Sequence, residues 1–233
     1  DFSRVSSCGT NTATSLPCMF SDLGRRHYDD AIAKHRENLL DVLMRGGYDV
    51  LWLDNNTGSK GLAKRAKEVR AGKSGDGRQI DSRLCNEEGC YDQILVEELR
   101  SVLPTIRRDT VIVVHLLGSH GPAYYARYPH AFAVFQPECR TNELQGCSDA
   151  QLRNTYDNTM LYTIHVLAEI ASLLGERRAP IDRYSSAEMK CGVLRGHAAG
   201  DGVPVCPQTA RRASESLAPD TAFDAAMLFI SDH

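Results

Sequence analysis

The chain has 233 residues, 24% of them charged, and a formal net charge of −3. That length suffices for one large domain with a buried core, and the near-balanced charge argues against a nucleic-acid-binding surface. The longest apolar runs, 111–117 and 227–230, fall far short of the roughly 20 residues that span a membrane as a helix.

The first predicted elements lie in the N-terminal third of the chain. Apolar residues recur at helical spacing over 29–45, and a pair of glycines follows as a stop signal. Residues 48–53 have the pattern of a short buried strand that ends in the polar loop 54–61. Residues 60–70 are rich in basic side chains and are predicted to form a surface helix.

Four further elements continue this alternation of helices and strands. Residues 91–103 and 148–174 have helical patterns, and the second is a long amphipathic helix. Residues 110–117 are β-branched and apolar on both faces, as is typical of a central parallel strand. Residues 223–230 are predicted to form another buried strand. This alternation predicts an α/β fold with a parallel sheet, whose ligand sites lie at the carboxyl ends of the strands.

Eight cysteines fall into neighbouring pairs along the sequence. Local disulfides are the simplest interpretation; a zinc-binding cysteine cluster is the alternative, but no C-x-x-C spacing occurs. Disulfides indicate an oxidising compartment such as the bacterial periplasm. The expected pairs are Cys8–Cys18, Cys85–Cys90, Cys139–Cys147 and, within a predicted insertion loop over residues 185–219, Cys191–Cys206.

Two segments near the ends of the chain carry residues suited to phosphate chemistry. Thr12 lies in a hydroxyl-rich run between the first two cysteines, where a helix start would offer unpaired N–H groups to a phosphate. Composition alone favours a plain capping cluster there. Asp232 and His233 follow the last predicted strand and supply oxygen and nitrogen donors suited to zinc, although such pairs are common.

Five motifs in one order resemble the lipid A phosphoethanolamine transferases, a branch of the alkaline phosphatase superfamily that includes the mobile colistin-resistance enzymes. The motifs are SCGTNTATSLPC at 7–18, DNNTGSKG at 54–61, HLLGSHGPAY at 115–124, NTYDN at 154–158 and SDH at 231–233. The resemblance implies an alkaline-phosphatase-like (sulfatase-like) parallel-sheet sandwich with helices on both faces, truncated here at both ends. It also implies transfer of phosphoethanolamine from phosphatidylethanolamine to a lipid A phosphate, a reaction associated with polymyxin and colistin resistance.

The resemblance assigns roles to six residues. Thr12 matches the family nucleophile, which carries phosphoethanolamine covalently. A threonine hydroxyl is a weak nucleophile at neutral pH, and a bound Zn²⁺ corrects this by favouring the deprotonated oxygen. Thr12, Asp232 and His233 match zinc ligands. Asn56, Lys60 and His120 match positions that bind the substrate, which suits an amide, an ammonium and an imidazole near phosphate oxygens.

The resemblance further implies that residues 1–233 form a partial periplasmic catalytic domain. In relatives, a Glu from a strand that would precede residue 1 and a His beyond residue 233 complete the site, and a membrane domain is present. Because these two residues are not part of the chain, it is expected to be at most feebly active. The sequence also shows no signal peptide and no initiator Met, as expected of a partial domain. The protein is expected to be a monomer at the periplasmic face of the inner membrane.

Several points stay open at the level of sequence. His115 is either a core histidine or a site residue, and Ile164 stands where relatives have an acidic residue. A phosphatase- or sulfatase-like hydrolase is an alternative, against which a threonine nucleophile counts, because sulfatases use a modified Cys or Ser. A non-catalytic remnant is another. The acceptor could be another glycan. The remaining histidines are expected on the surface: His27, His35, His130, His165 and His197.

Overall fold

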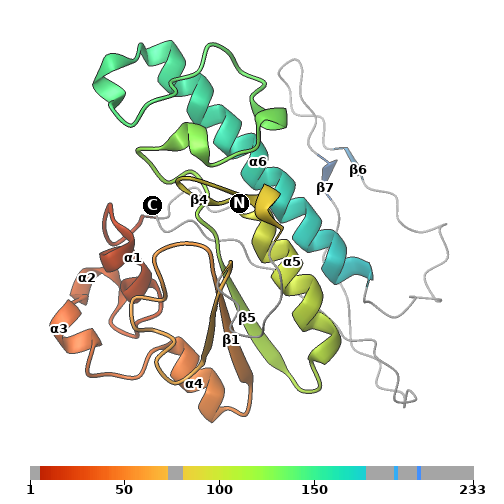
Figure 1. Cartoon of the computed structure of the whole chain (residues 1–233). Coiled ribbons are helices and arrows are strands. Elements are labelled where there is room, and N and C mark those ends of the chain that lie inside the picture. Colours follow the sequence, from red (N-terminus) through yellow and green to blue (C-terminus); the bar gives the residue numbers. More distant parts are fainter. Residues whose placement is uncertain (1–5, 73–80, 177–191, 194–203, 206–233) are drawn as a thin grey trace. The chain divides into compact units, whose positions relative to one another are not determined.

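The computed structural model describes residues 6–72, 81–176, 192–193 and 204–205 (Figure 1). The chain divides into a first unit, Asp1–Ser172 with Leu228–His233, and a second, Leu173–Met227. In the second unit, β6 (Gly192–Val193) and β7 (Pro204–Val205) form an antiparallel pair. Several sequence predictions lie outside the described residues: the strand 223–230, the Cys191–Cys206 pair, the ligands Asp232 and His233, the surface residue His197 and most of the insertion loop 185–219.

A three-stranded parallel sheet forms the centre of the first unit (Figure 1). Strand β1 (Asp49–Asp54) lies between β2 (Lys67–Arg70) and β5 (Thr110–His115). β1 and β5 pair in parallel over their whole length, so that Asp54 lies opposite His115 at the carboxyl ends of the two strands. The loops that follow these two strands therefore leave the sheet at the carboxyl ends of its strands, which is where parallel sheets bind ligands. The predicted strands 48–53 and 110–117 are confirmed.

The predicted basic helix over 60–70 is wrong. Residues 60–65 form turns and only the last four residues are regular, as β2, an edge strand of the sheet that the described residues form. Lys60 and its glycine neighbour Gly61 have φ values of +52° and +88°, a left-handed conformation that no α-helix contains. Leu62 and Ala63 are buried and fix the turn to the core. The charged run thus shields a sheet edge, a common use of charge on edge strands.

The predicted helix over 29–45 is two helices, α3 (Asp30–Ala33) and α4 (Leu39–Arg45). The side chain of Asn38 accepts hydrogen bonds from the N–H groups of Leu40 and Asp41, and the Asp41 carboxylate accepts one from the N–H of Asn38. This reciprocal capping box starts a new helix where the hydrophobic periodicity alone predicted a continuous one.

The remaining elements follow the sequence patterns closely. Helix α5 (Gln93–Val102) and helix α6 (Asp149–Glu176) confirm the predictions for 91–103 and 148–174. No described helix is long and apolar enough to cross a membrane. The other regular elements are α1 (Thr12–Met19), α2 (Gly24–His27), β3 (Cys85–Asn86), β4 (Gly89–Cys90) and the 3₁₀ helices Ser82–Leu84, Leu103–Thr105, Tyr124–Ala126, His130–Phe132 and Leu144–Gly146.

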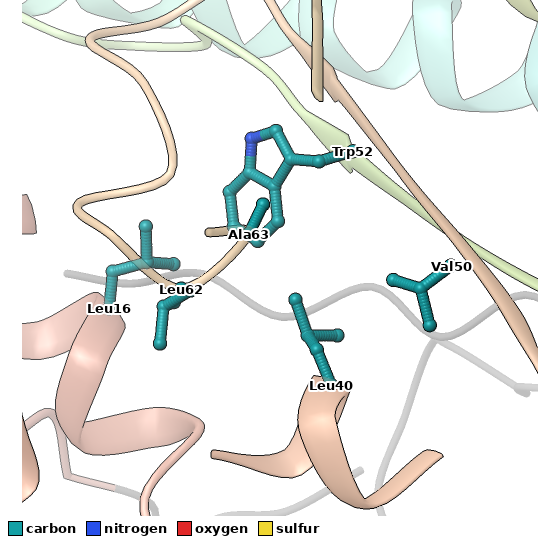
Figure 2. Packing of buried hydrophobic residues seen from close by; sticks show 6 residues of the cluster. All are labelled: Leu16, Leu40, Val50, Trp52, Leu62 and Ala63. Carbon is teal, nitrogen blue, oxygen red and sulfur yellow. The ribbon is translucent and has the colours of Figure 1, made fainter. Parts of the chain in front are cut away.

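The core is built on the central strand β1. Trp52 has no exposed surface and packs with five other buried side chains from α1, α4, β1 and the turn before β2: Leu16, Leu40, Val50, Leu62 and Ala63 (Figure 2). Leu51 and Leu53 alternate with Trp52 along the strand and are also buried. Both faces of β1 are therefore covered, as expected of the central strand of a parallel sheet.

Three of the four predicted cysteine pairs are disulfides in the structure. Cys8–Cys18 ties the segment before α1 to its last turn, Cys85–Cys90 closes the β3–β4 hairpin, and Cys139–Cys147 closes the loop that precedes α6. Within the described residues no cysteine is free.

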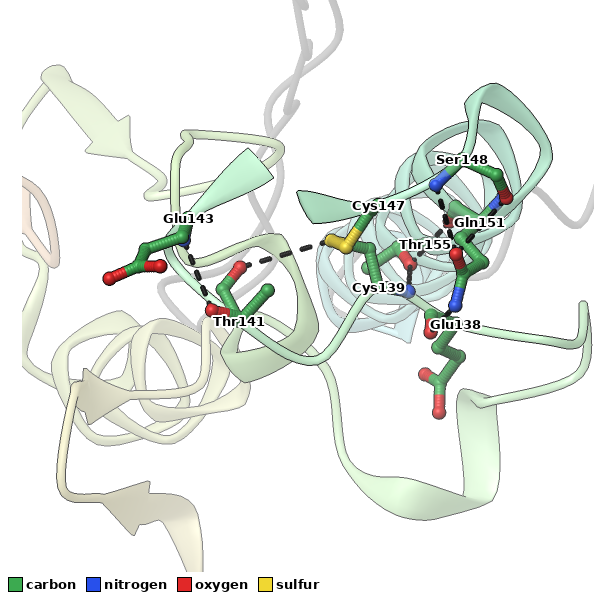
Figure 3. The surroundings of a disulfide bond; sticks show 8 residues. All are labelled: Glu138, Cys139, Thr141, Glu143, Cys147, Ser148, Gln151 and Thr155. Carbon is green, nitrogen blue, oxygen red and sulfur yellow. Dashed lines mark hydrogen bonds between the residues drawn. A yellow bond between two sulfur atoms is a disulfide. The ribbon is translucent and has the colours of Figure 1, made fainter. Parts of the chain in front are cut away.

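The Cys139–Cys147 bridge is expected to stabilise the protein by tethering the loop before α6. Figure 3 shows the buried Cys139, whose backbone N–H donates to Thr155 Oγ1 on α6 at 2.6 Å. Its partner is eight residues away in sequence. Replacing both cysteines with alanine is expected to lower the free energy of unfolding by about 2.5 kcal/mol, because the unfolded chain regains loop entropy. Urea denaturation measures the change, and an equally stable double variant would contradict it.

Candidate active site

Thr12 is the first residue of α1 and is buried. Asn11 caps the helix, since its side-chain oxygen accepts a hydrogen bond from the N–H of Thr14 at 3.0 Å. The Cys8–Cys18 disulfide fixes the segment before the helix to the far end of the helix. The first turn of a helix carries N–H groups without intrahelical partners and the positive end of the helix dipole. Thr12 therefore lies where an anionic phosphate is favoured.

The structure brings Thr12 together with His120, which lies 108 residues later in the sequence. Thr12 Oγ1 and His120 Nε2 are 3.1 Å apart, within hydrogen-bonding distance. His120 belongs to the loop that follows β5 at the carboxyl edge of the sheet. A hydroxyl within hydrogen-bonding distance of an imidazole is the arrangement that a nucleophile and its general base require.

Asn56 and Lys60 lie on the loop that follows β1. Asn56 Nδ2 donates to the carbonyl of Leu116 at 2.9 Å and so connects its loop to the loop that carries His120. Lys60 Nζ donates to the carbonyl and the hydroxyl of Thr57 at 2.9 and 2.6 Å, within its own loop. Substrate binding by these side chains stays a prediction.

Sequence reasoning missed the carboxylate that ends β1. Asp54 Oδ1 and His115 Nδ1 are 2.7 Å apart, and both side chains are buried. Burial alone would raise the pKa of the Asp54 carboxyl, but the hydrogen bond and charge of His115 outweigh it and hold that pKa below its ordinary value. His115 also meets Trp52 edge-on, with ring centroids 5.3 Å apart. His115 is therefore a core histidine that joins the ends of β1 and β5.

A second buried carboxylate, Asp92, lies just before α5. It accepts hydrogen bonds from the side chain of Asn55 and from the backbone N–H groups of Leu117 and Gly118. Burial raises the pKa of the Asp92 carboxyl above its ordinary value, and the hydrogen bonds oppose that rise. The only sequence signal for Asp92 was an acidic residue at a helix start, which normally indicates a cap.

The described residues contain two candidate donors for a metal ion, Thr12 and His120. They contain no group of three or more His, Cys, Asp or Glu side chains that could hold a metal ion. Thr12 and His120 bring a hydroxyl oxygen and an imidazole nitrogen together, which are donors of the kinds that zinc accepts. This donor pair fits zinc, and ligation by Asp232 and His233 stays a prediction.

Four of the five histidines predicted to lie on the surface are among the described residues. His165 Nε2 pairs with Glu169 at 3.1 Å on α6. Ile164, where the resemblance predicts an acidic residue, is 60% exposed on the same helix. Three histidines are exposed as predicted: His27, His35 and His130. His197 is outside the described residues.

Comparison with known proteins finds similarity over most of the described chain. The family model described as Sulfatase matches residues 1–181. Phosphoethanolamine transferase EptA of Salmonella typhimurium is 46% identical over 174 residues, which cover 74% of this chain and 31% of that protein. This chain thus spans about a third of the length of the curated relatives it matches.

Two solved structures show the same architecture. The soluble domain of lipooligosaccharide phosphoethanolamine transferase A from Neisseria meningitidis has a TM-score of 0.68 and 41% identity, covering 73% of this chain and 50% of that one. The C-terminal periplasmic domain of EcEptC from Escherichia coli, solved in complex with Zn, has a TM-score of 0.50 and 22% identity, covering 70% of this chain and 45% of that one. The second match concerns the fold alone.

Proposed function

Because the chain belongs to the sulfatase family, on the branch of the phosphoethanolamine transferases, we propose that it transfers phosphoethanolamine from phosphatidylethanolamine to a phosphate of lipid A. The observation that carries the proposal is the contact of 3.1 Å between Thr12 Oγ1 and His120 Nε2 at the start of a helix. The names of the similar proteins from Salmonella and Neisseria support phosphoethanolamine as the group that is transferred. The name of the Neisseria protein also supports an acceptor of the lipooligosaccharide class.

In the first step, Thr12 Oγ1 attacks the phosphorus of the donor. A new P–O bond forms to Thr12 while the P–O bond to diacylglycerol breaks. His120 Nε2, in the tautomer without a proton there, takes the hydroxyl proton from Thr12 and passes it to the diacylglycerol oxygen. The N–H groups at the start of α1 hold the phosphate oxygens during the attack. The product is phosphoethanolamine esterified to Thr12.

In the second step, a phosphate oxygen of the acceptor attacks the same phosphorus from the side that diacylglycerol has left. The bond to Thr12 breaks, and the threonine oxygen recovers a proton from His120, which takes it from the attacking hydrogen phosphate of the acceptor. Such a two-step covalent route gives ping-pong kinetics. Asn56 and Lys60, on the neighbouring loop, would orient the phosphoethanolamine group through their amide and ammonium donors.

Zinc is the cofactor we propose, held by Thr12 together with Asp232 and His233. When bound, zinc favours the deprotonated form of the threonine hydroxyl and so supplies the nucleophile at neutral pH. We place the protein at the periplasmic face of the inner membrane, as a monomer. The three disulfides of the described chain support an oxidising compartment.

The covalent step and its zinc dependence are tested by mass spectrometry of the chain after incubation with phosphatidylethanolamine. We expect a phosphoethanolamine adduct that peptide mapping places on Thr12. Prior removal of metal by a chelator is expected to slow adduct formation at least about tenfold, and added Zn²⁺ to restore it. An adduct on another residue would contradict the nucleophile, and an unchanged rate after chelation would contradict the cofactor.

A further inference from the structure

We propose that Asp92 is a positioning residue for the transfer reaction: its buried carboxylate fixes the loop after β5 and thereby holds His120 against Thr12. The inference rests on the proposed function, since it assigns Asp92 a role through the Thr12–His120 pair. It adds a residue that none of the sequence motifs contains.

The carboxylate of Asp92 holds two consecutive backbone N–H groups of the loop. Oδ1 accepts from the N–H of Leu117 at 2.8 Å, and Oδ2 accepts from the N–H of Gly118 at 2.7 Å. Gly118 has a φ of +54°, in the left-handed region that glycine adopts easily. The N–H of His120 then donates to the carbonyl of Leu117 at 3.3 Å. The carboxylate therefore fixes the turn from which the His120 side chain leaves.

The side chain of Asp92 does not cap the helix that it precedes. It occupies the position before the first residue of α5, where an aspartate side chain usually accepts an N–H of the first helical turn. Here its side chain makes no such capping bond. The hydrogen bonds of its carboxylate go instead to Asn55, Leu117 and Gly118, on the loops that follow β1 and β5. Burying a carboxylate costs free energy, and Asp92 is only 3% exposed. Its hydrogen bonds, which offset that cost, go to the loops that carry the candidate site residues.

Two further contacts make the arrangement rigid. Asn55 Nδ2 donates both to Asp92 and, at 2.9 Å, to the carbonyl of Cys90 in the disulfide-closed hairpin. On the other side of the loop, Arg127 Nε donates to the carbonyl of His120 at 2.9 Å. Burial lowers the pKa of the Arg127 guanidinium below its ordinary value, and the charges of Glu88 and Asp92 oppose that lowering. His120 is thus held from Asp92 before it and from Arg127 after it.

The test variant is Asp92→Asn, which keeps the size of the side chain but leaves one acceptor oxygen for two backbone N–H groups. We expect adduct formation on Thr12 to slow by about 10- to 100-fold, the range found when partners that orient a reacting group are removed. The KM for phosphatidylethanolamine is expected to stay within about twofold, because Asp92 orients the base and does not bind the donor.

A double-mutant cycle with His120→Ala separates positioning from a general structural role. If Asp92 acts through His120, Asp92→Asn will cost less than about threefold once His120 is absent. Asp41→Asn is the matched control. Asp41 is similarly buried at 6% exposure and also accepts a backbone N–H, but it lies on α4. In the double variant with His120→Ala, the fold loss in the rate of adduct formation is expected to equal the product of the two single losses, because Asp41 does not act through His120.

A second measurement decides the inference without turnover. In the Asp92→Asn chain, the amides of Leu117 and Gly118 are expected to exchange with solvent faster, and the ring signals of His120 to shift in NMR spectra at fixed pH. The Asp41→Asn chain is expected to show neither change. A chain that forms no adduct but shows these changes in Asp92→Asn would count against the proposed function and leave the positioning of His120 by Asp92 standing. Unchanged exchange at these amides, or a full multiplicative loss in the His120→Ala background, would overturn the inference.

Discussion

Replacing Thr12 with alanine is expected to abolish the phosphoethanolamine adduct, lowering the rate of its formation by more than about a thousandfold, because the attacking oxygen is gone. We expect no neighbouring hydroxyl group to replace it. Ser15 is committed to the helix, since its Oγ donates to the carbonyl of Asn11 at 2.8 Å. Intact-mass measurement over a time course gives the rate directly. Thr12→Ser keeps the oxygen and is expected to retain most of the rate.

Thr10→Ala is the matched control for this prediction. Thr10 lies two residues before Thr12 in the same hydroxyl-rich run, but its side chain is exposed. The control is expected to form the adduct at the normal rate. Adduct formation that survives in Thr12→Ala and is lost in Thr10→Ala would move the nucleophile to the other threonine and remove the role we assign to His120.

The second large effect is expected on stability, from Asp54→Asn. This change takes the charge from a pair in which His115 Nδ1 lies 2.7 Å from the carboxylate and both side chains are buried. Loss of one partner of a buried pair typically costs about 3–5 kcal/mol of unfolding free energy. We expect a loss near the lower limit, because an amide oxygen still accepts a hydrogen bond. Urea denaturation at neutral pH measures it.

The acid dependence of stability gives an independent signature of the same pair. Since the pKa of Asp54 is lower in the folded protein than its ordinary value, its stabilising contribution is present above the pKa of the unfolded carboxyl. That contribution is lost as the pH falls through the folded pKa, below about pH 4. Asp54→Asn is therefore expected to show a flatter decline in stability in this range than the unaltered chain.

An exposed pair serves as the control for this prediction. Asp22 pairs with Arg36 at the surface, and both side chains are about half exposed. Asp22→Asn is expected to leave the denaturation midpoint unchanged at neutral pH, because exposed pairs are screened by solvent. If Asp54→Asn were as harmless as this control, the pair joining the ends of β1 and β5 would not be a stabilising element.

Local patterns predicted the elements whose signal lies within one segment. Strands β1 and β5 and helices α5 and α6 follow from hydrophobic spacing, and the disulfides follow from the nearness of their cysteines in sequence. The sulfatase-like, alkaline-phosphatase-like fold inferred from the motifs is confirmed by the Sulfatase model match and the Neisseria structure. The helix predicted for residues 60–70 was wrong because the charged residues of this segment suit an edge strand as well as a helix.

The parts that sequence reasoning missed depend on partners far along the chain. Asp54 meets His115 across 61 residues, and Asp92 meets Leu117 across 25. Contacts between residues so far apart in sequence leave no trace in the local hydrophobic pattern. A buried carboxylate looks like any surface acid until its donors are known. The motif resemblance named Thr12 and His120 separately, and the fold placed them in contact.

The disulfides of the described chain also bear on how the protein matures. Each joins a cysteine to the next one in sequence, across 10, 5 and 8 residues. For a chain delivered N-terminus first into an oxidising compartment, each thiol meets its correct partner before the following cysteine emerges. Wrong pairs, which must be reopened by thiolate attack, would then have little chance to form. Maturation of these bridges would need an oxidant but little shuffling, and the turn bearing Thr12 would be locked while most of the sheet is still to be made.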